Sequence, residues 1–266
     1  MFASFPLHIK TSFSLDKCTL ELSSTLSFAS VWKHKFGEHL TTHPFYTPTG
    51  KVNAEMMTDK REVYIAQGQN FRVLALPYKS GDNFYIILPS SKDTPIRSNS
   101  LINDSFAEEV DEIQNQTISL DIVIENLTPT ILSNLKFEKH NMDIMIPVFE
   151  LSKDIDLRKI LTSLGLENLF KPGQSELNNI LSNSATTNVC TKENIHITSA
   201  KQKNKIIVNE KGTVAISFQS FISNYATGAS MGIVDPFIVD RPFIFMINNG
   251  AFIGIINDPT KKGDSF

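Results

Sequence analysis

The sequence is poor in cysteine and has no long apolar segment. Its two cysteines, Cys18 and Cys190, cannot form a disulfide framework. The sequence does not distinguish one bridge from two buried thiols, and the tendency of cysteine to pack as a small hydrophobe favours free thiols. The longest apolar stretch, residues 244–256, is interrupted at residues 248–250, so no segment is predicted to span a bilayer. The first residues lack an apolar segment behind a basic start, which predicts no signal peptide.

An excess of positive charge is also missing. The 266 residues include 25 basic and 28 acidic ones, and the net charge of −3 lacks the basic footprint of a nucleic-acid-binding protein. Hydrophobic residues make up 41% of the chain, which excludes disorder as its overall state. Nineteen phenylalanines stand against one tryptophan and five tyrosines, a set that favours a dry core rich in strands.

Alternating apolar residues and turn signals predict one α+β domain dominated by strands, with no internal repeat and no linker. Asn249-Gly250 is typical of a hairpin turn between two strands that are apolar on both faces, which we expect in the middle of the core. Pro242 indicates a bulge or an edge. Capping patterns at Ser105, Thr128 and Asp156 predict three short helices. The predicted strands cover residues 20–36, 51–58, 61–66, 71–76, 84–88, 142–151, 195–209, 236–247 and 251–257.

The catalytic patterns in the sequence do not combine into an active site. Residues 228–232, Gly-Ala-Ser-Met-Gly, match the nucleophile elbow of hydrolases, which needs a helix after the serine and a histidine later in the chain. Two prolines follow this segment, and the last histidine, His196, precedes Ser230. The sequence therefore predicts no enzyme and no cofactor. Without cysteine or carboxylate at ligand spacing, no metal site is expected at the neighbouring histidines His34, His39 and His43.

Two segments flank a long polar stretch near the C-terminus. Residues 209–215 read N-E-K-G-T-V-A, and residues 237–243 read F-I-V-D-R-P-F. Here the chain resembles the serpins, a family of serine protease inhibitors, because the first segment is similar to the serpin hinge and the second to the serpin signature. Further landmarks follow in the family's order, including W-x-x-x-F, at residues 32–36, 45–46, 56–57, 76–79, 87–89, 147–149, 164–166 and 257–259.

The resemblance runs from about residue 20 to residue 262 and implies a serpin fold. That fold has mixed, mainly antiparallel sheets, short helices and an exposed reactive-centre loop, here at about residues 211–235. Only the C-terminal two-thirds of the family's domain is covered, so we expect residues 1–266 to form a single partial serpin domain that lacks the N-terminal helices. Relative to the family, residues 90–124 resemble an insertion.

The resemblance implies inhibition by a bait. A serine protease attacks the exposed loop and forms an acyl-enzyme through its own serine. The cut loop then inserts as a new strand into the main sheet and distorts the protease before deacylation. The inhibitor supplies no catalytic residue. The expected partner is a serine protease, and neither a nucleic acid nor a membrane is expected.

The hinge must be able to enter a sheet. In an inserted strand, alternate side chains face the core. Counted from Thr213, four side chains face inward, and three of them are small, so insertion is sterically feasible. The fourth, Gln219, would be a buried amide that needs hydrogen-bond partners. The run Ala-Ile-Ser-Phe departs from the Ala-rich run usual in inhibitory members, which bears on the speed of insertion. The hinge residues implied by the resemblance are Glu210, Gly212, Thr213 and Ala215, and the inward set is Thr213, Ala215, Ser217 and Gln219.

The position of the reactive bond depends on the end from which it is counted. Counting sixteen residues on from Glu210, as in most inhibitory members, places it between Ala226 and Thr227. Counting back from Pro242 points instead to the bond after Met231, because this loop is longer than usual.

The residue before the bond predicts the class of protease. Ala226 favours elastase-like proteases, whereas Tyr225, or Met231 followed by Gly232, suits chymotrypsin-like ones. No arginine or lysine lies within residues 212–240, so trypsin-like proteases are disfavoured throughout the loop.

The region that controls sheet opening departs from the family. Ser24 and Gln202 stand where the family usually has Asn and His, and Trp32 belongs to the same predicted region. The His-centred network of the family cannot form here. A non-inhibitory serpin fold and an inactive truncated product therefore remain alternatives to an inhibitor. The resemblance implies an extracellular protein, while the predicted lack of a signal peptide leaves a cytoplasmic one open.

Overall fold

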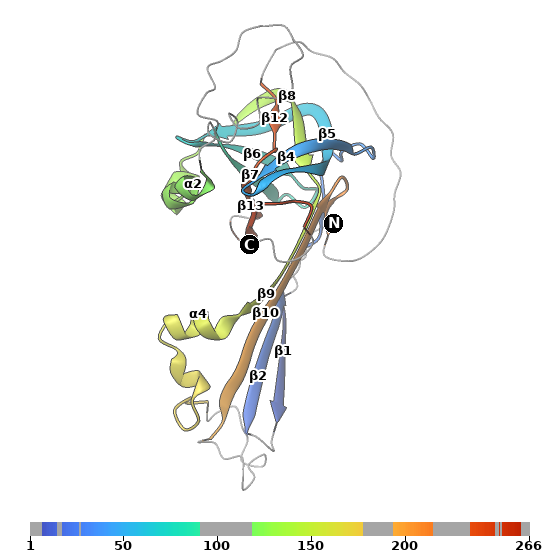
Figure 1. Ribbon diagram of the computed structural model, residues 1–266. Coiled ribbons are helices and arrows are strands. Elements are labelled where there is room, and N and C mark those ends of the chain that lie inside the picture. Colours follow the sequence, from blue (N-terminus) through green and yellow to red (C-terminus); the bar gives the residue numbers. More distant parts are fainter. Residues whose placement is uncertain are drawn as a thin grey trace. The chain divides into compact units, whose positions relative to one another are not determined.

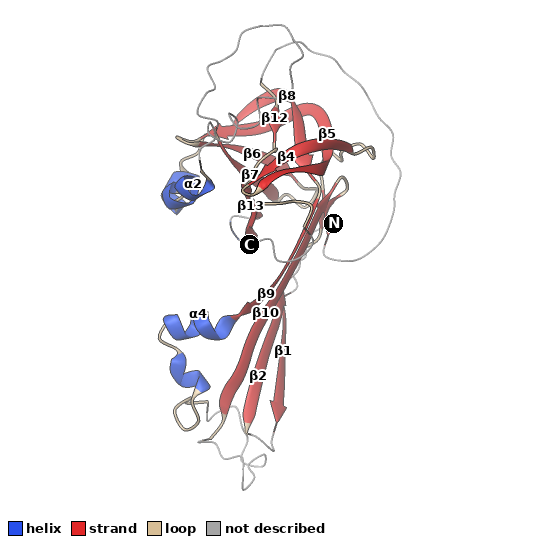
Figure 2. Ribbon diagram, viewed as in Figure 1, coloured by secondary structure: helices blue, strands red, loops and turns tan. Residues whose placement is uncertain are grey.

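The computed structural model describes residues 7–14, 18–26, 28–90, 119–177, 194–214, 235–247, 250 and 252–261. Strands predominate in the described chain (Figure 2). The strands are β1 (Leu7–Ser14), β2 (Thr19–Leu26), β3 (Ser30–Val31), β4 (Thr41–Thr47), β5 (Gly50–Gln67), β6 (Phe71–Pro77), β7 (Asn83–Pro89), β8 (Glu138–Pro147), β9 (Phe149–Asp156), β10 (His196–Asn209), β11 (Gly212–Val214), β12 (Phe237–Ile238), β13 (Phe243–Ile247) and β14 (Phe252–Ile256). The helices are α2 (Leu120–Asn126), α3 (Pro129–Ser133), α4 (Leu157–Ser163) and the 3₁₀ helix η1 (Glu167–Phe170).

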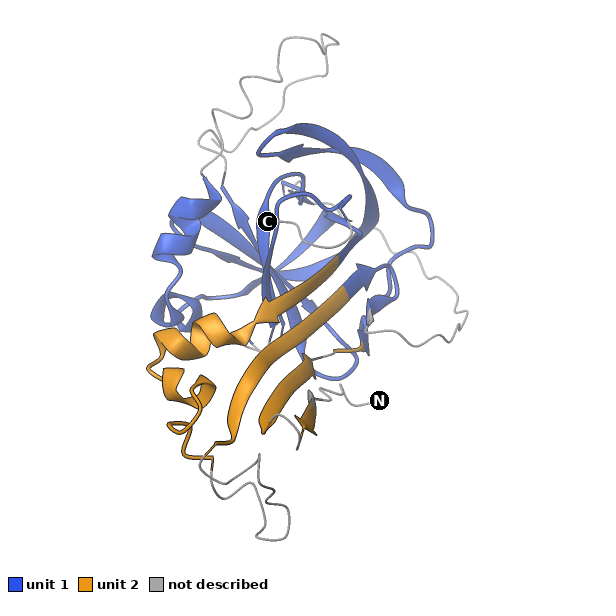
Figure 3. Ribbon diagram, turned by 60° about the horizontal axis from the view of Figure 1, so that its bottom comes forward, with its two compact units in different colours: residues 1–3, 30–150, 207–266 blue, residues 4–29, 151–206 orange. Residues whose placement is uncertain are grey.

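The chain divides into two compact units (Figure 3). Unit 1 comprises residues 1–3, 30–150 and 207–266, and unit 2 comprises residues 4–29 and 151–206. The strand β10 begins in unit 2 and ends in unit 1. Its last residues belong to the unit that carries the hinge.

Unit 1 is built on an eight-stranded sheet with the order β12-β8-β5-β6-β7-β13-β14, in which β4 also pairs with β5. The 18-residue strand β5 organises it, because β4, β8 and β6 pair antiparallel with successive parts of its length. The prediction of two strands at residues 51–58 and 61–66 is wrong. No glycine or proline separates them, and β8 supplies pairing partners through the junction, from Met56 opposite Pro147 to Ile65 opposite Glu138.

Apolar side chains fill unit 1 on both faces of this sheet. On one face, Val123 of α2 packs against a cluster formed by Ala66, Phe71, Val73, Ile87 and Ile244. Phe84 stacks on Phe245 with ring centroids 5.8 Å apart. The predicted hairpin of residues 71–76 and 84–88 is confirmed as β6 and β7.

The C-terminal strands differ from the prediction in two respects. A break at residues 239–242 separates β12 from β13 and includes Pro242, which has no N–H to give to a sheet. β13 pairs between β7 and β14, as a central strand should. The expectation that both hairpin strands lie in the middle of the core is wrong for β14, which ends the sheet and leaves Ile253 64% exposed.

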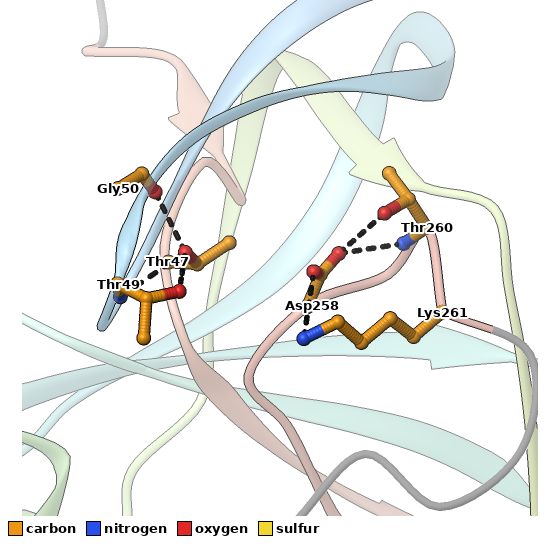
Figure 4. A network of polar contacts seen from close by, with 6 residues as sticks. All are labelled: Thr47, Thr49, Gly50, Asp258, Thr260 and Lys261. Atoms are coloured by element: carbon orange, nitrogen blue, oxygen red, sulfur yellow. Dashed lines mark hydrogen bonds and ion pairs between the residues drawn. The ribbon is translucent and has the colours of Figure 1, made fainter.

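Two short polar networks close turns of unit 1 (Figure 4). The Thr47 hydroxyl donates to the carbonyl of Gly50 at 2.6 Å and closes the turn from β4 to β5. After β14, Asp258 accepts hydrogen bonds from the N–H and the hydroxyl of Thr260 and lies near Lys261. Partial burial opposes ionisation of Asp258, but the bonds from Thr260 and the charge of Lys261 outweigh it and hold the pKa of the carboxyl below its ordinary value.

Unit 2 contains β1, β2 and most of β9 and β10 (Figure 1). β1 is antiparallel to β2, β2 is parallel to β10, and β9 also pairs with β10. The helices α4 and η1 contribute Leu157, Leu161 and Phe170 to a cluster with Leu20 and Ile197 of the sheet.

Two long predicted strands are shorter than expected. The strand predicted at residues 20–36 ends at Leu26, and pairing resumes at Ser30–Val31, beside the hinge, with Trp32 in an isolated bridge to Tyr78. The strand predicted at residues 142–151 is two strands, β8 and β9. Their break follows Pro147, where the N–H of Val148 turns to bond the carbonyl of Glu55 at 2.9 Å.

The helix caps predicted at Thr128 and Asp156 are confirmed, since each side chain accepts a bond from the first turn of its helix. The helix α2 was not predicted, and the predicted helix at residues 105–115 lies outside the described residues. Among the helices that the structure describes, none is long and apolar enough to cross a membrane.

The preference for a free thiol is wrong for Cys18, which is disulfide-bonded. The sequence has one other cysteine, Cys190, which lies outside the described residues. Cys18 directly precedes β2, whose first residue Thr19 is paired with His196 at the start of β10. Composition alone cannot distinguish a bonded cysteine from a free one.

Candidate functional site

Gly212 and Thr213 of the predicted hinge lie in unit 1 in the short strand β11, which has a neighbour on each side. β11 turns back antiparallel onto the end of β10, with Asn209 opposite Gly212 and Val208 opposite Thr213. Its other edge pairs with β3, where Gly212 lies opposite Val31. The start of the hinge is therefore already part of a sheet.

Both the backbone conformation at position 212 and the close approach of β3 require a glycine there. Its φ of +151° lies in a region that side chains disfavour, and a Cβ there would lie 2.2 Å from the carbonyl oxygen of Ser30. That neighbour is backbone, which cannot move aside as a side chain would. Glycine allows β3 and β11 to approach at this point.

Thr213 is the first inward side chain of the hinge, and it is fully buried. Its Oγ1 lies 2.5 Å from the hydroxyl oxygen of Tyr78. Burial raises the pKa of the Tyr78 phenol well above its ordinary value, and the charge of Asp82 adds to this, while the bond to Thr213 works the other way. The phenol therefore keeps its proton through the physiological range.

Trp32 joins this phenol to the turn of the hinge. Its ring stacks on Tyr78 with centroids 4.6 Å apart and planes inclined by 4°. Its Nε1 donates to the carbonyl of Asn209 at 2.8 Å, and its backbone N–H donates to the carbonyl of Lys211 at 3.1 Å. The N–H of Phe36 completes the set by bonding the carbonyl of Glu210 at 3.1 Å.

Arg61 of β5 fixes the segment after Trp32. Its guanidinium donates to the carbonyl of His34, lies over the ring of Phe36 at 4.1 Å and contacts Asp59 at 3.3 Å. Desolvation lowers its pKa to about 10, and the charge of Asp59 opposes that shift. The sequence marks Tyr78 only as part of the landmark at residues 76–79 and does not mark Arg61, because no local pattern shows contacts between residues so far apart in the chain.

The far end of the loop is anchored by the signature segment. Arg241 donates through Nε to the carbonyl of Pro89 at 3.0 Å and through its guanidinium to Asp240 at 2.8 Å. The carbonyl of Asp240 accepts from the N–H of Tyr46, and Val239 donates to Met145. Both ends of the loop are thus fixed in unit 1.

The strands β2 and β10 pair directly with each other in unit 2, and each carries one of the residues assigned to the sheet-opening region. Ser24 is opposite Gln202. The amide of Gln202 donates to Oδ1 of Asn204 at 2.9 Å. Trp32, assigned to the same region, contacts the hinge in unit 1 instead.

Several predicted residues cannot be placed. The structure brings together Glu210, Gly212 and Thr213, whereas the remaining hinge residue and the reactive-bond candidates lie outside the described residues. Among the residues described, no group of three histidine, cysteine or acidic side chains is arranged to hold a metal. The unplaced residues are Ala215, Tyr225, Ala226, Thr227, Met231 and Gly232.

Comparison with known proteins identifies the family. The family model described as serpin, serine protease inhibitor, matches residues 8–259. The chain belongs to the serpin family. Plasminogen activator inhibitor 1 of Sus scrofa is 27% identical over 260 residues, and Serpin-ZX of Arabidopsis thaliana is 26% identical over 259 residues. Each match covers 92% of this serpin but only 56% and 59% of the relatives, so the chain spans a little over half of their length.

Solved structures show the same fold. The native state of tengpin, a thermophilic serpin, matches with a TM-score of 0.60 and 23% identity over 90% of this chain and 55% of its own. A serpin of the trematode Schistosoma haematobium matches with a TM-score of 0.59 and 21% identity, over 91% and 57% of the two chains. The expected serpin family, the α+β serpin fold and its truncation relative to other members are confirmed.

Proposed function

We propose that this serpin inhibits a serine protease of elastase-like or chymotrypsin-like specificity by serving as a bait whose cut loop inserts into the sheet. The observation that carries the proposal is the hinge. β11 already pairs antiparallel with the end of β10, and further along β10 its neighbour is the parallel strand β2. A loop continuing from β11 along β10 would enter between these two strands.

The register of β11 supports the predicted inward set. Continued along β10, it places Ala215 opposite the buried Ile206 and Gln219 opposite Gln202. Gln202 is itself paired with Ser24 of β2. An inserted Gln219 would therefore lie between the amide of Gln202 and the hydroxyl of Ser24, and both can form hydrogen bonds with it. Its buried amide would then have the partners that it needs.

The length of β10 favours one reactive bond over the other. In the same register Tyr225 falls opposite His196, the first residue of β10, so a loop cut after Ala226 has about the length that β10 can pair. A loop cut after Met231 would carry further residues with no partner on β10. This argument supports Ala226–Thr227 and, with it, an elastase-like protease.

The test is incubation with pancreatic-type elastase and with chymotrypsin, analysed on a denaturing gel, with the N-terminus of the released fragment sequenced. We expect a band at the summed mass that survives denaturation and a new N-terminus at Thr227. The matched control is a protease whose active-site serine is chemically blocked, which cannot form the acyl bond and should give no such band. Complete cleavage without the band would contradict inhibition and favour a non-inhibitory or inactive truncated serpin.

An extracellular location is part of the proposal. A disulfide persists in oxidising compartments, so the bonded state of Cys18 supports a protein that works outside the cytosol. Expression in the secretory pathway followed by thiol labelling of the product tests this. Cytosolic retention with Cys18 reactive would contradict it.

A further inference from the structure

We infer that the hydroxyl of Tyr78 is a positioning group that holds the hinge docked in the uncut protein, so that insertion starts with Thr213 already in place. The docked position of the hinge in the uncut protein does not depend on any protease. Its effect on inhibition rests on the proposed function, and the experiment tests docking and inhibition separately.

The contact between Tyr78 and Thr213 is buried on both sides. Tyr78 is 1% exposed and Thr213 is 0% exposed, and their oxygens are 2.5 Å apart. Tyr78 comes directly after β6 and Thr213 lies in β11, so the bond joins the hinge to a fixed part of unit 1. If the hinge left, the phenol hydroxyl would lose a partner in a dry site, which opposes undocking.

The other contacts around the hinge hold the backbone of the turn at residues 209–211, but they do not depend on which side chain stands at position 213. Trp32 and Phe36 bond the carbonyls of Asn209, Glu210 and Lys211. These bonds use the backbone and would form with any sequence in the turn. The phenol of Tyr78 is the described group that bonds the side chain of the first inserted residue, so it recognises a hydroxyl at position 213.

A docked hinge affects the competition between loop insertion and hydrolysis of the acyl-enzyme. Inhibition requires that, after cleavage, the loop inserts before the acyl-enzyme is hydrolysed. With Thr213 already seated, insertion can continue from an existing edge instead of starting from a free loop. Loss of the Tyr78 hydroxyl shifts the hinge toward the undocked state and directs more protein to plain cleavage.

The experiment compares Tyr78→Phe, Thr213→Val and the double variant in the full uncut chain. Phenylalanine keeps the ring that stacks on Trp32, and valine keeps the volume of threonine. Thr213→Ser restores a hydroxyl and serves as the rescue. Tyr64→Phe, which removes an exposed phenol hydroxyl of β5, is the matched control.

Two readouts need no protease. Hydrogen exchange reports the backbone amides of residues 212–214, and acrylamide quenching reports Trp32, the one tryptophan of the chain. We expect roughly tenfold faster exchange in each single variant, the factor for loss of one hydrogen bond of ordinary strength. The double variant should add little to either single one, because both remove the same bond. Thr213→Ser and Tyr64→Phe should stay near wild type, and thermal unfolding checks that every variant is folded.

Each outcome bears on one claim. Wild-type exchange in both Tyr78→Phe and Thr213→Val would overturn the positioning role, as would full additivity in the double variant. Faster exchange together with fewer trapped complexes per cut molecule would support docking and its consequence. Faster exchange in a protein that traps neither protease would support docking and contradict the proposed function.

Discussion

At the scale of single residues, the hinge depends on side chains that act for different physical reasons. Gly212 is needed because β3 passes too close for a Cβ, whereas Thr213 is needed because its hydroxyl meets Tyr78. Trp32 uses its backbone N–H and its indole N–H to hold two carbonyls of the same turn. The site is therefore sensitive to exchanges as small as one methyl or one hydroxyl group.

Burial of Tyr78 predicts a pH dependence of stability. Its pKa is raised, so above about pH 10 the folded state keeps a proton that the unfolded chain has lost. The free energy of unfolding must then fall as pH rises, by up to about 1.4 kcal/mol per pH unit from this one group. Urea unfolding of wild type and Tyr78→Phe between pH 9 and pH 11 measures this. We expect a shallower decline in the variant, and equal slopes would contradict the burial of the phenol.

The residues proposed as the hinge stand in a motif that the sequence displays, whereas the residues that contact them do not. Gly212 and Thr213 belong to a short motif that can be recognised along the chain. Tyr78 and Arg61 act on segments that are distant in sequence, and their roles follow from sheet pairing. For the same reason the disulfide of Cys18 was not foreseen.

At the scale of elements, β11 determines what can follow it. A strand of three residues pairs on both edges and sets the register for every residue added to it. Helix caps and the β6–β7 hairpin were predictable because their signals lie within a few residues. The extent of β5 and the break between β8 and β9 were not, because pairing partners decide where a strand ends.

The register predicts opposite effects of the same substitution at adjacent loop positions. Ala215→Glu would place a carboxylate opposite the buried Ile206, whereas Ile216→Glu would place it opposite Lys205 on the other face. Burying an unpaired charge costs several kcal/mol, so insertion of the first variant should be blocked. We expect Ala215→Glu to be cleaved with at least a tenfold loss of trapped complex and Ile216→Glu to retain trapping, as counted on denaturing gels. Equal behaviour of the two would contradict the register.

At the scale of the whole molecule, the described residues form an eight-stranded sheet in unit 1 and a six-stranded sheet whose strands come from both units. It spans a little over half of the relatives that it matches. Of the parts that the proposed mechanism uses, the described residues contain a docked hinge, a fixed far end and the directly paired strands β2 and β10, while the bait loop lies outside them.

Cleavage in the loop should therefore raise the stability of the molecule. About ten new backbone pairings, at roughly 1 kcal/mol each, correspond to an increase in Tm of roughly 20 °C or more for a chain of this size. Calorimetry before and after limited cleavage by elastase measures this change. An unchanged Tm would mean that the cut loop stays outside the sheet.

The parallel pairing of β2 with β10 has a consequence for the energy landscape of the uncut chain. A strand that continues from β11 is antiparallel to β10, and it would be antiparallel to β2 as well, so one parallel interface would give way to two of the more stable antiparallel kind. The uncut chain would then be metastable, and the intact loop would be the tether that keeps it so. Substitutions that tighten the contact between β2 and β10 should make the uncut protein more robust and, by the same step, a poorer trap.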